Sequence, residues 1–310
     1  MELGFVFRTA ADRAARGAPK DARVYQIAAL SSLLAYGLTA LHFEIGLAQA
    51  AITIASAIAA QWAGTKLARL SAFDPKSALI SALSLCLLLR TPSLTVAAAA
   101  AALAVGSKFV LRWRGKHVFN PTNLTLTLVL ASGLGWASPG QWGNPAIFAF
   151  AILCLGTLVV TRAARADVTL AFLGFHAAIL FGYSAWLGQP VAVPLHRMQS
   201  GALLLFAFFM ISDPKTTPDS RTGRVLFALL VAAGAAVVQF VMYRTNGLLW
   251  SLVACSILTP LIDRILPGPR YAWTRVPPTR PGESNRGDSH ENAVPFLPAG
   301  NRDRLAAGRI

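Results

Sequence analysis

The densest polar cluster of this largely apolar sequence is the segment 213–218, with the sequence DPKTTP. Pro214 fixes the backbone and has no N–H group, and the side chains of Asp213 and Thr216 can bond backbone groups that are left free there. An ordinary capped turn between two helices would explain these residues. A loop beside a ligand would explain them equally well, with Lys215 facing an anionic or phosphate-bearing group. The residues alone leave both interpretations open.

A second polar group lies at residues 119–123, with the sequence FNPTN. Asparagines near the start of a helix are common caps, and this is the simpler interpretation of Asn120 and Asn123. Their amides also supply donors and acceptors that suit a planar amide or an isoalloxazine ring. Thr122 adds a hydroxyl to a helix that is otherwise compatible with lipid.

Composition places these residues in a membrane protein. Apolar types make up 55 % of the 310 residues and charged types 13 %, whereas soluble domains carry about 25 % charged residues. The net charge of +15 comes from basic residues in short gaps between apolar runs, which is typical of membrane topology rather than of nucleic-acid binding. The three cysteines lie inside apolar runs, without C-x-x-C spacing, so neither a disulfide framework nor a zinc site is expected.

A membrane-spanning helix needs about 20 mostly apolar residues, and the sequence predicts an all-α, polytopic fold of about ten such helices. The predicted segments are 25–42, 46–64, 77–89, 93–107, 118–134, 145–161, 168–187, 199–212, 225–243 and 246–262. Segments 77–89 and 199–212 are too short to cross and are followed by proline. We expect both to be half-helices whose ends are covered by protein.

The positions of lysines and arginines test this topology. With the N-terminus in the cytoplasm and alternating spans, 25 of the 28 basic residues fall on the cytoplasmic side, and only Arg90, Arg197 and Arg244 fall outside. The expected organisation is a basic cytoplasmic segment 1–24, a transmembrane domain 25–265 and a disordered, proline-rich basic tail 266–310. The alternative for the tail is docking onto a soluble partner.

An internal repeat relates the two halves of the domain, about 25–135 and 145–265. Each half has a short helix that ends near a proline, Pro92 or Pro214, followed by a Thr-Asn pair that begins at Thr122 or Thr245. Because each half contains five spans, the second copy enters the membrane inverted. In such repeats the binding site lies between the halves. We therefore predict one site made of Asn120, Thr122, Asn123, Asp213, Lys215, Thr216, Thr245 and Asn246.

Other chemistry finds little support in the sequence. Acidic residues fall at helix ends or in loops, so a carboxylate-driven proton pump within this chain alone is not expected. His176 has no second histidine nearby and is expected to bond between helices. The basic segment 108–117 favours an anchor to anionic lipid over a docking site. The sequence offers no set of catalytic residues and no metal-ligand cluster.

Three motifs, in the same order as in the family, resemble the RnfD/NqrB family. Residues 206–216, FAFFMISDPKT, followed by Gly223 and Arg224, resemble its signature G-A-F-F-x-x-T-D-P-V-T…G-R. Residues 119–121 resemble its F-N-P, and residues 260–263 its closing P-L-I-D. The resemblance runs from the first helix to about Asp263. It implies an integral subunit of an ion-translocating, flavin-containing redox complex, with ten helices in an inverted repeat like that of urea transporters.

The sequence departs from this family between the fifth and sixth helices. Full-length members carry a long insertion there, with a threonine that binds FMN covalently, whereas residues 135–144 form a short connection without threonine. The resemblance therefore implies a noncovalent flavin, FMN or riboflavin, rather than covalent FMN. The chain is most similar to short stand-alone RnfD-like proteins, some of which accompany enediyne biosynthesis clusters.

Two functions follow. The first is an RnfD-like subunit of an electron-transport system in the bacterial cytoplasmic membrane, not itself catalytic, with both termini in the cytoplasm. Its partners would be the lipid bilayer and other membrane redox subunits or further copies of the chain, and not nucleic acid. The alternative is a stand-alone channel or exporter of a small solute on the same fold, which the missing attachment loop favours.

Overall fold

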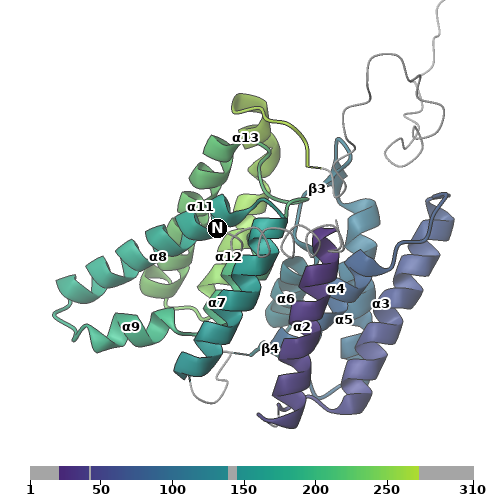
Figure 1. The fold of residues 1–310 in the computed structure, drawn as a ribbon, viewed down its shortest axis with the longest axis horizontal. Coiled ribbons are helices and arrows are strands. Elements are labelled where there is room, and N and C mark those ends of the chain that lie inside the picture. Colours follow the sequence, from purple (N-terminus) through teal and green to yellow (C-terminus); the bar gives the residue numbers. More distant parts are fainter. Residues whose placement is uncertain (1–20, 42, 139–144, 272–310) are drawn as a thin grey trace, which may run out of the picture. The chain divides into compact units, whose positions relative to one another are not determined.

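The computed structural model describes residues 21–41, 43–138 and 145–271, and the predicted N-terminal segment and proline-rich tail lie almost wholly outside these ranges. The described chain is almost entirely helical (Figure 1). Its first half contains α2 (Ala22–Thr39), α3 (Leu47–Leu67), α4 (Lys76–Leu88), α5 (Leu94–Val110) and α6 (Pro121–Ser132). Each of these helices falls on one of the predicted segments, which confirms the helical class.

The second half contains more pieces than the sequence suggests. They are α7 (Pro145–Arg162), α8 (Ala166–Trp186), α9 (Ala192–Met198), α10 (Gly201–Leu205), α11 (Arg221–Ala236), α12 (Gly247–Ser256) and α13 (Thr259–Ile265). Two π-helical turns, η1 (Phe206–Met210) and η2 (Val237–Val241), continue α10 and α11. The short helix α9 was not predicted, and the segment 246–262 is broken into two helices that meet at 51°.

Among the described residues, three helical segments are long and apolar enough to cross a membrane: α3, α8 and α11 with η2. The bent pair α12 and α13 forms a fourth if it is counted as one span. The chain is therefore a multi-pass membrane protein. The helix α4 has 13 residues, which at 1.5 Å per residue is about 20 Å, well short of a hydrocarbon core of about 30 Å. The full set of ten spans stays a prediction.

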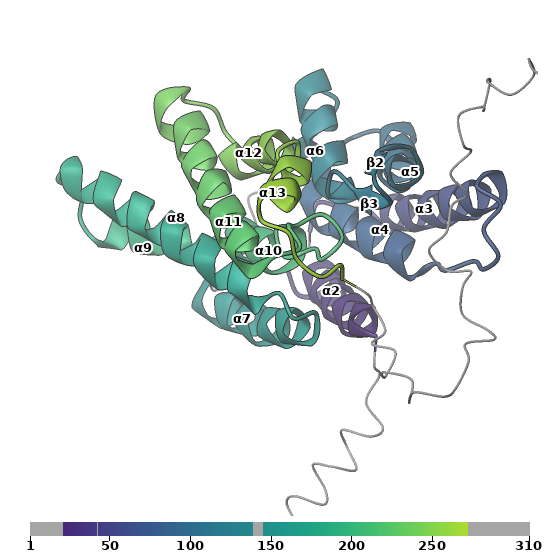
Figure 2. The ribbon, with the colours of Figure 1, turned by 90° about the horizontal axis from the view of Figure 1, so that it is seen from above.

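The packing of the helices follows the same order in both halves (Figures 1 and 2). In the first half α3 packs on α5 and α2 on α4; in the second, α8 packs on α11 and α7 on α10 and η1. Between the halves, α2 contacts α7 and α6 contacts α12. Two copies related by a twofold axis make such contacts between equivalent helices, here α2 with α7 and α6 with α12. The pattern supports the inverted repeat, which stays a prediction.

Two short antiparallel ladders close the helix ends. Strand β1 (Leu89–Arg90) pairs with β4 (Trp136–Ala137), and β2 (Arg112–Trp113) pairs with β3 (Lys116–His117). The helix α4 stops at Leu88 because Leu89 is extended, with ψ of 128°. The backbone groups that are freed there bond to β4, which is how irregular backbone survives at membrane depth. At the tip of β2–β3, residues 114 and 115 have positive φ.

We call the side of the molecule that carries β2–β3, the loop 212–220 and α13 the basic face. Two contacts extend this face to the other helices, because Lys108 at the end of α5 bonds Ser77 at the start of α4, and Arg23 at the start of α2 pairs with Asp74. The ladder β1–β4 and α9 lie at the opposite end of the helices (Figure 1).

Candidate functional site

Asn120 joins the two halves of the chain at the basic face. As the cap of α6, its Oδ1 accepts a hydrogen bond from the Asn123 N–H over 3.0 Å. Its Nδ2 donates to Asp213 Oδ2 and to the Met210 carbonyl, each over 3.3 Å. The predicted contact between the start of α6 and the turn after η1 is therefore present, and the amide acts both as a cap and as a bridge.

The turn after η1 satisfies most of its polar groups itself. Asp213 Oδ1 accepts from the Lys215 N–H over 3.0 Å, and the Asp213 carbonyl accepts from the hydroxyls of Thr216 and Thr217. This is the capped turn that the sequence allows. Only the Oδ2 atom of Asp213, which Asn120 contacts, reaches beyond the turn to the other half.

Basic groups surround Asp213. Burial raises the pKa of the Asp213 carboxyl, and the Lys215 N–H, the Lys108 and Lys215 ammonium groups and the Arg165 guanidinium oppose that rise. Burial lowers the pKa of Lys215, although Asp213 raises it. Lys215 Nζ donates to the Tyr271 carbonyl over 3.5 Å. The arrangement can hold a negative charge, or a proton, close to the basic face.

Asn123 reaches the other half one turn deeper in α6. Its Nδ2 donates to the Leu249 carbonyl of α12 over 3.1 Å. Its Oδ1 and the Thr125 hydroxyl are buried without a partner among the described residues, and Thr122 is buried beside them. Buried polar groups are usually paired, so both atoms could accept a further hydrogen bond. Asn123 lies on the face of α6 that contacts α12.

Thr245 and Asn246 do not join the contacts of Asp213. Thr245 is exposed, and its hydroxyl accepts from Asn246 Nδ2 over 3.3 Å. Asn246 has a left-handed backbone, with φ of 60°, at the start of α12. The structure therefore divides the predicted site into a polar group at the basic face and this pair at the other end of the helices.

A small cavity of about 60 Å³ lies between the two halves, and Asn246 is the one residue of the predicted site that lines it. Its walls contain Leu88 and Met210, which are 122 residues apart, and Leu126 and Leu249, which are 123 residues apart. These offsets are those of the sequence repeat. The carbonyls of Met210 and Leu249 accept from Asn120 and Asn123, so the cavity lies against the asparagine bridges.

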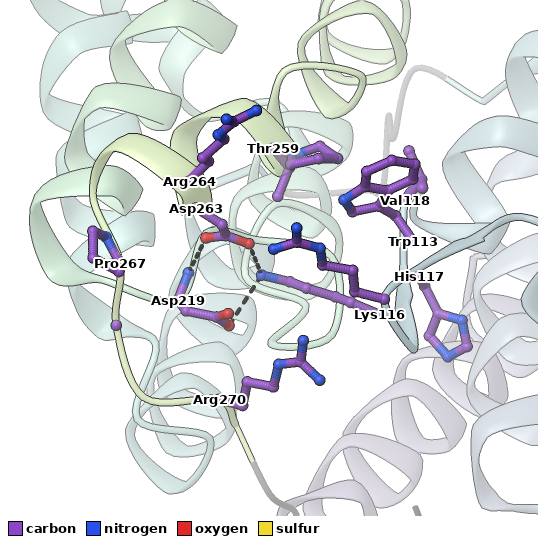
Figure 3. Close-up of a pocket in the computed structure, with 13 residues that line it drawn as sticks. Trp113, Lys116, His117, Val118, Asp219, Thr259, Asp263, Arg264, Pro267 and Arg270 are labelled. Carbon is purple, nitrogen blue, oxygen red and sulfur yellow. Dashed lines mark hydrogen bonds and ion pairs between the residues drawn. The ribbon is translucent and has the colours of Figure 1, made fainter. Parts of the chain in front are cut away.

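The sequence did not reveal a second cluster on the basic face, around Lys116 of β3. Lys116 Nζ lies 3.0 Å from Asp219 Oδ1 and 2.7 Å from Asp263 Oδ2, and the Asp219 N–H donates to Asp263 Oδ1 (Figure 3). These residues line a pocket of about 170 Å³. We assigned the segment 108–117 to lipid anchoring because nothing in its own sequence points to partners more than a hundred residues away.

Comparison with known proteins gives one family. The model of the NQR2, RnfD, RnfE family matches residues 132–271. The D subunit of the ion-translocating oxidoreductase complex of Alcanivorax borkumensis is 31 % identical over 134 residues, which are 43 % of this chain and 36 % of that protein. The protein of the same name from Escherichia coli strain SMS-3-5 is 30 % identical over 136 residues, with the same shares.

The protein of this name from Tolumonas auensis is 35 % identical over 85 residues, which are 27 % of this chain and 23 % of that protein. The chain thus spans about a third of the length of the first two relatives and less of the third. The family match contains the turn at Asp213 and the closing motif at residues 260–263. Residues 119–121, the third motif, lie outside it.

Proposed function

We propose that this chain, an RnfD-like member of the NQR2, RnfD, RnfE family by residues 132–271, is a membrane subunit of an ion-translocating redox complex. Other membrane subunits of such a complex would be its partners. The chain would supply position and electrostatics, and a redox group would carry the electrons. We further propose the bacterial cytoplasmic membrane as its location, with the basic face toward the cytoplasm.

One observation carries this proposal. The turn at Asp213, which lies in the region that matches the family, is bonded through Asn120 to the start of α6 in the other half. A charged group inside a membrane domain is costly and is usually functional. Here the carboxylate accepts from an amide whose Nδ2 is not needed for capping, because capping of α6 uses the Oδ1 atom alone. That Nδ2 also donates to the Met210 carbonyl, in the same half as Asp213.

The cavity between the two halves is too small for a flavin. Pockets for ligands of that size enclose about 300–1,000 Å³, whereas this cavity encloses about 60 Å³ and is lined mainly by apolar side chains. Asn123 Oδ1 and Thr125 Oγ1 are buried without a partner among the described residues, but neither residue lines this cavity. Noncovalent flavin stays a prediction, and the role of Asp213 does not depend on it.

The experiment is purification of the tagged full chain from its own host in mild detergent. We expect redox subunits of the complex to copurify, and the assembly to absorb in the visible range. Asp213→Asn keeps the size of the side chain and should insert normally but reduce the electron transfer of that assembly. A colourless chain that is recovered without redox subunits would overturn the proposal.

A second candidate is a channel for a small solute, which the cavity of about 60 Å³ favours. This volume holds a few atoms rather than a cofactor, and its lining comes from equivalent positions of both halves. Liposomes that contain the purified chain test this function. Flux of a small neutral solute without any redox partner would favour the channel over the subunit.

A further inference from the structure

The pocket beside Lys116 contains more positive charge than its own ion pairs neutralise. Both carboxylates, Asp219 and Asp263, are taken up by Lys116. Arg114, Arg264 and Arg270 also line the pocket, and none of the three has an ion pair or hydrogen bond with a described residue. Four cations and two carboxylates leave a net charge of +2, so the pocket suits an anion.

A hydroxyl inside the pocket also has no partner. Thr259 at the start of α13 is 2 % exposed and lines the pocket, and its Oγ1 makes no hydrogen bond to any described residue. A buried hydroxyl without a partner carries a desolvation cost of about 1–3 kcal/mol. An oxygen-rich anion in the pocket would remove that cost by accepting a hydrogen bond from the hydroxyl, and arginines suit phosphate because they can bind it through two N–H groups.

Apolar side chains are exposed on the elements that form the pocket, and one of them, Trp113, lines it. On the side of β2, Val110 is 78 % exposed and Trp113 is 56 % exposed; on α13, Leu261 is 53 % and Ile265 is 66 % exposed. Figure 3 shows Trp113 on one side of the Lys116 ion pairs and Arg264 and Arg270 on either side of the two aspartates. A basic pocket with apolar side chains at helix ends is a site where phosphate and acyl chains can be bound together.

We propose that this pocket binds the phosphate of an anionic phospholipid, with Arg264, Arg270 and the Thr259 hydroxyl as its ligands. Lys116 is a positioning residue, because its pairs with Asp219 and Asp263 hold β3 against α13. The lipid would fix the β2–β3 hairpin to the end of the helix bundle. This inference is independent of the redox function.

The test uses the full chain in a neutral detergent, with bound lipid counted by native mass spectrometry. Short-chain phosphatidylglycerol is the probe, and phosphatidylcholine and inorganic phosphate are the comparisons. We expect phosphatidylglycerol to bind best. A surface arginine is worth about a fivefold change in affinity for anionic lipid, so Arg264→Gln with Arg270→Gln should weaken binding about 30-fold.

A matched control removes the same charge from the same face. Lys66 and Arg69 are exposed at the end of α3 and do not line the pocket. Their charges would act on a phosphate bound in the pocket only through solvent, where salt screens them, so Lys66→Gln with Arg69→Gln should change binding by less than about threefold. If both double variants lose lipid binding equally, the lipid is attracted to the basic face as a whole, and the proposed site is overturned. If inorganic phosphate binds as tightly as phosphatidylglycerol, the bound phosphate does not need to come from a lipid, and the proposal of a lipid ligand is overturned.

Thr259→Val tests the interior of the pocket without changing charge or size. It should weaken phosphatidylglycerol binding about tenfold while the chain unfolds at the same or a higher temperature in lipid-free detergent. The higher temperature is expected because the substitution removes an unpaired hydroxyl. If this variant binds lipid as well as the wild type does, the phosphate does not contact the interior of the pocket, and the proposal is overturned.

Discussion

Asn120→Asp separates the two contacts that Asn120 makes at the start of α6. An aspartate keeps the acceptor that caps the helix, and Asp and Asn are equally good caps. It loses the amide donor that reaches Asp213 Oδ2 and the Met210 carbonyl over 3.3 Å. It also places a second carboxylate against Asp213. If capping were the whole role of Asn120, this variant would be as stable as the wild type.

The magnitude follows from that distance. Two unit charges 3.3 Å apart repel by about 5 kcal/mol at an effective dielectric constant of 20. One carboxyl can relieve the repulsion by taking up a proton, so we expect a loss of about 2–4 kcal/mol at pH 7. The pKa of that carboxyl in the folded chain lies above its unfolded value. Stability is therefore retained at about pH 4 and lost as the pH rises through the folded pKa.

Two further variants complete the experiment. Asn120→Ala removes both the cap and the donor and should cost about 2–4 kcal/mol, without the pH dependence of the aspartate. The exchanged pair, Asn120→Asp with Asp213→Asn, returns an amide donor and a carboxylate to the same place. The Oδ1 atom of the new amide at position 213 can still accept from the Lys215 N–H, as the carboxylate does. We therefore expect stability within about 1 kcal/mol of the wild type.

Thermal unfolding in mild detergent, followed by tryptophan fluorescence between pH 4 and 8, measures these effects. A loss of about 3 kcal/mol corresponds to about 6–12 °C in Tm. The reasoning is refuted if Asn120→Asp unfolds at the wild-type temperature at every pH. It is also refuted if the exchanged pair is no more stable than Asn120→Asp, because the contact with Asp213 would then carry no energy.

Three other substitutions test separate parts of the structure by the same unfolding assay. Gly135→Ala should destabilise the chain by about 1–3 kcal/mol, since the added Cβ would lie 2.6 Å from the Arg90 carbonyl. Gly174→Ala is the control, because its Cβ would meet nothing within 4 Å and should not destabilise the chain. Burial, aided by nearby cations, lowers the pKa of His117 to about 3. The free energy of unfolding is therefore highest above about pH 6.5 and falls by about 1.4 kcal/mol per pH unit below it. His117→Gln should reduce that acid sensitivity. Lys116→Met leaves its two aspartates facing each other and should cost about 2–4 kcal/mol at pH 7 and less at pH 4.

The sequence was sufficient to predict those features that depend on a local pattern of residue types. Apolar runs of sufficient length marked the helices, and Pro92 and Pro214 marked the ends of the two short ones. The asparagine at the start of α6 and the Asp-Pro turn were predicted to meet, and they do. They were assigned to one site because the binding sites of inverted repeats lie between the halves.

Features that depend on contacts between residues far apart in the chain could not be predicted from the sequence. The basic segment of β2–β3 has the composition of a lipid anchor, but the partners of Lys116 lie 103 and 147 residues further along the chain. Thr245 and Asn246 match Thr122 and Asn123 in sequence, yet they lie at the other end of the helices, as the predicted inversion of the second copy would require. An inverted repeat places equivalent residues at opposite ends unless they lie near its axis.

The charges at the two ends of the cavity bear on the choice between the two functions. Arg90, two residues after Leu88 of the cavity wall, is buried and donates to the carbonyls of Cys86 and Leu89. Asp213, three residues after Met210, is the carboxylate near the other end. A cation that entered the cavity would meet the fixed charge of Arg90, whereas the basic groups around Asp213 offset its charge toward an anion. A channel through this cavity would therefore exclude cations, and cation movement by this chain would need a coupled partner, as the redox subunit would have.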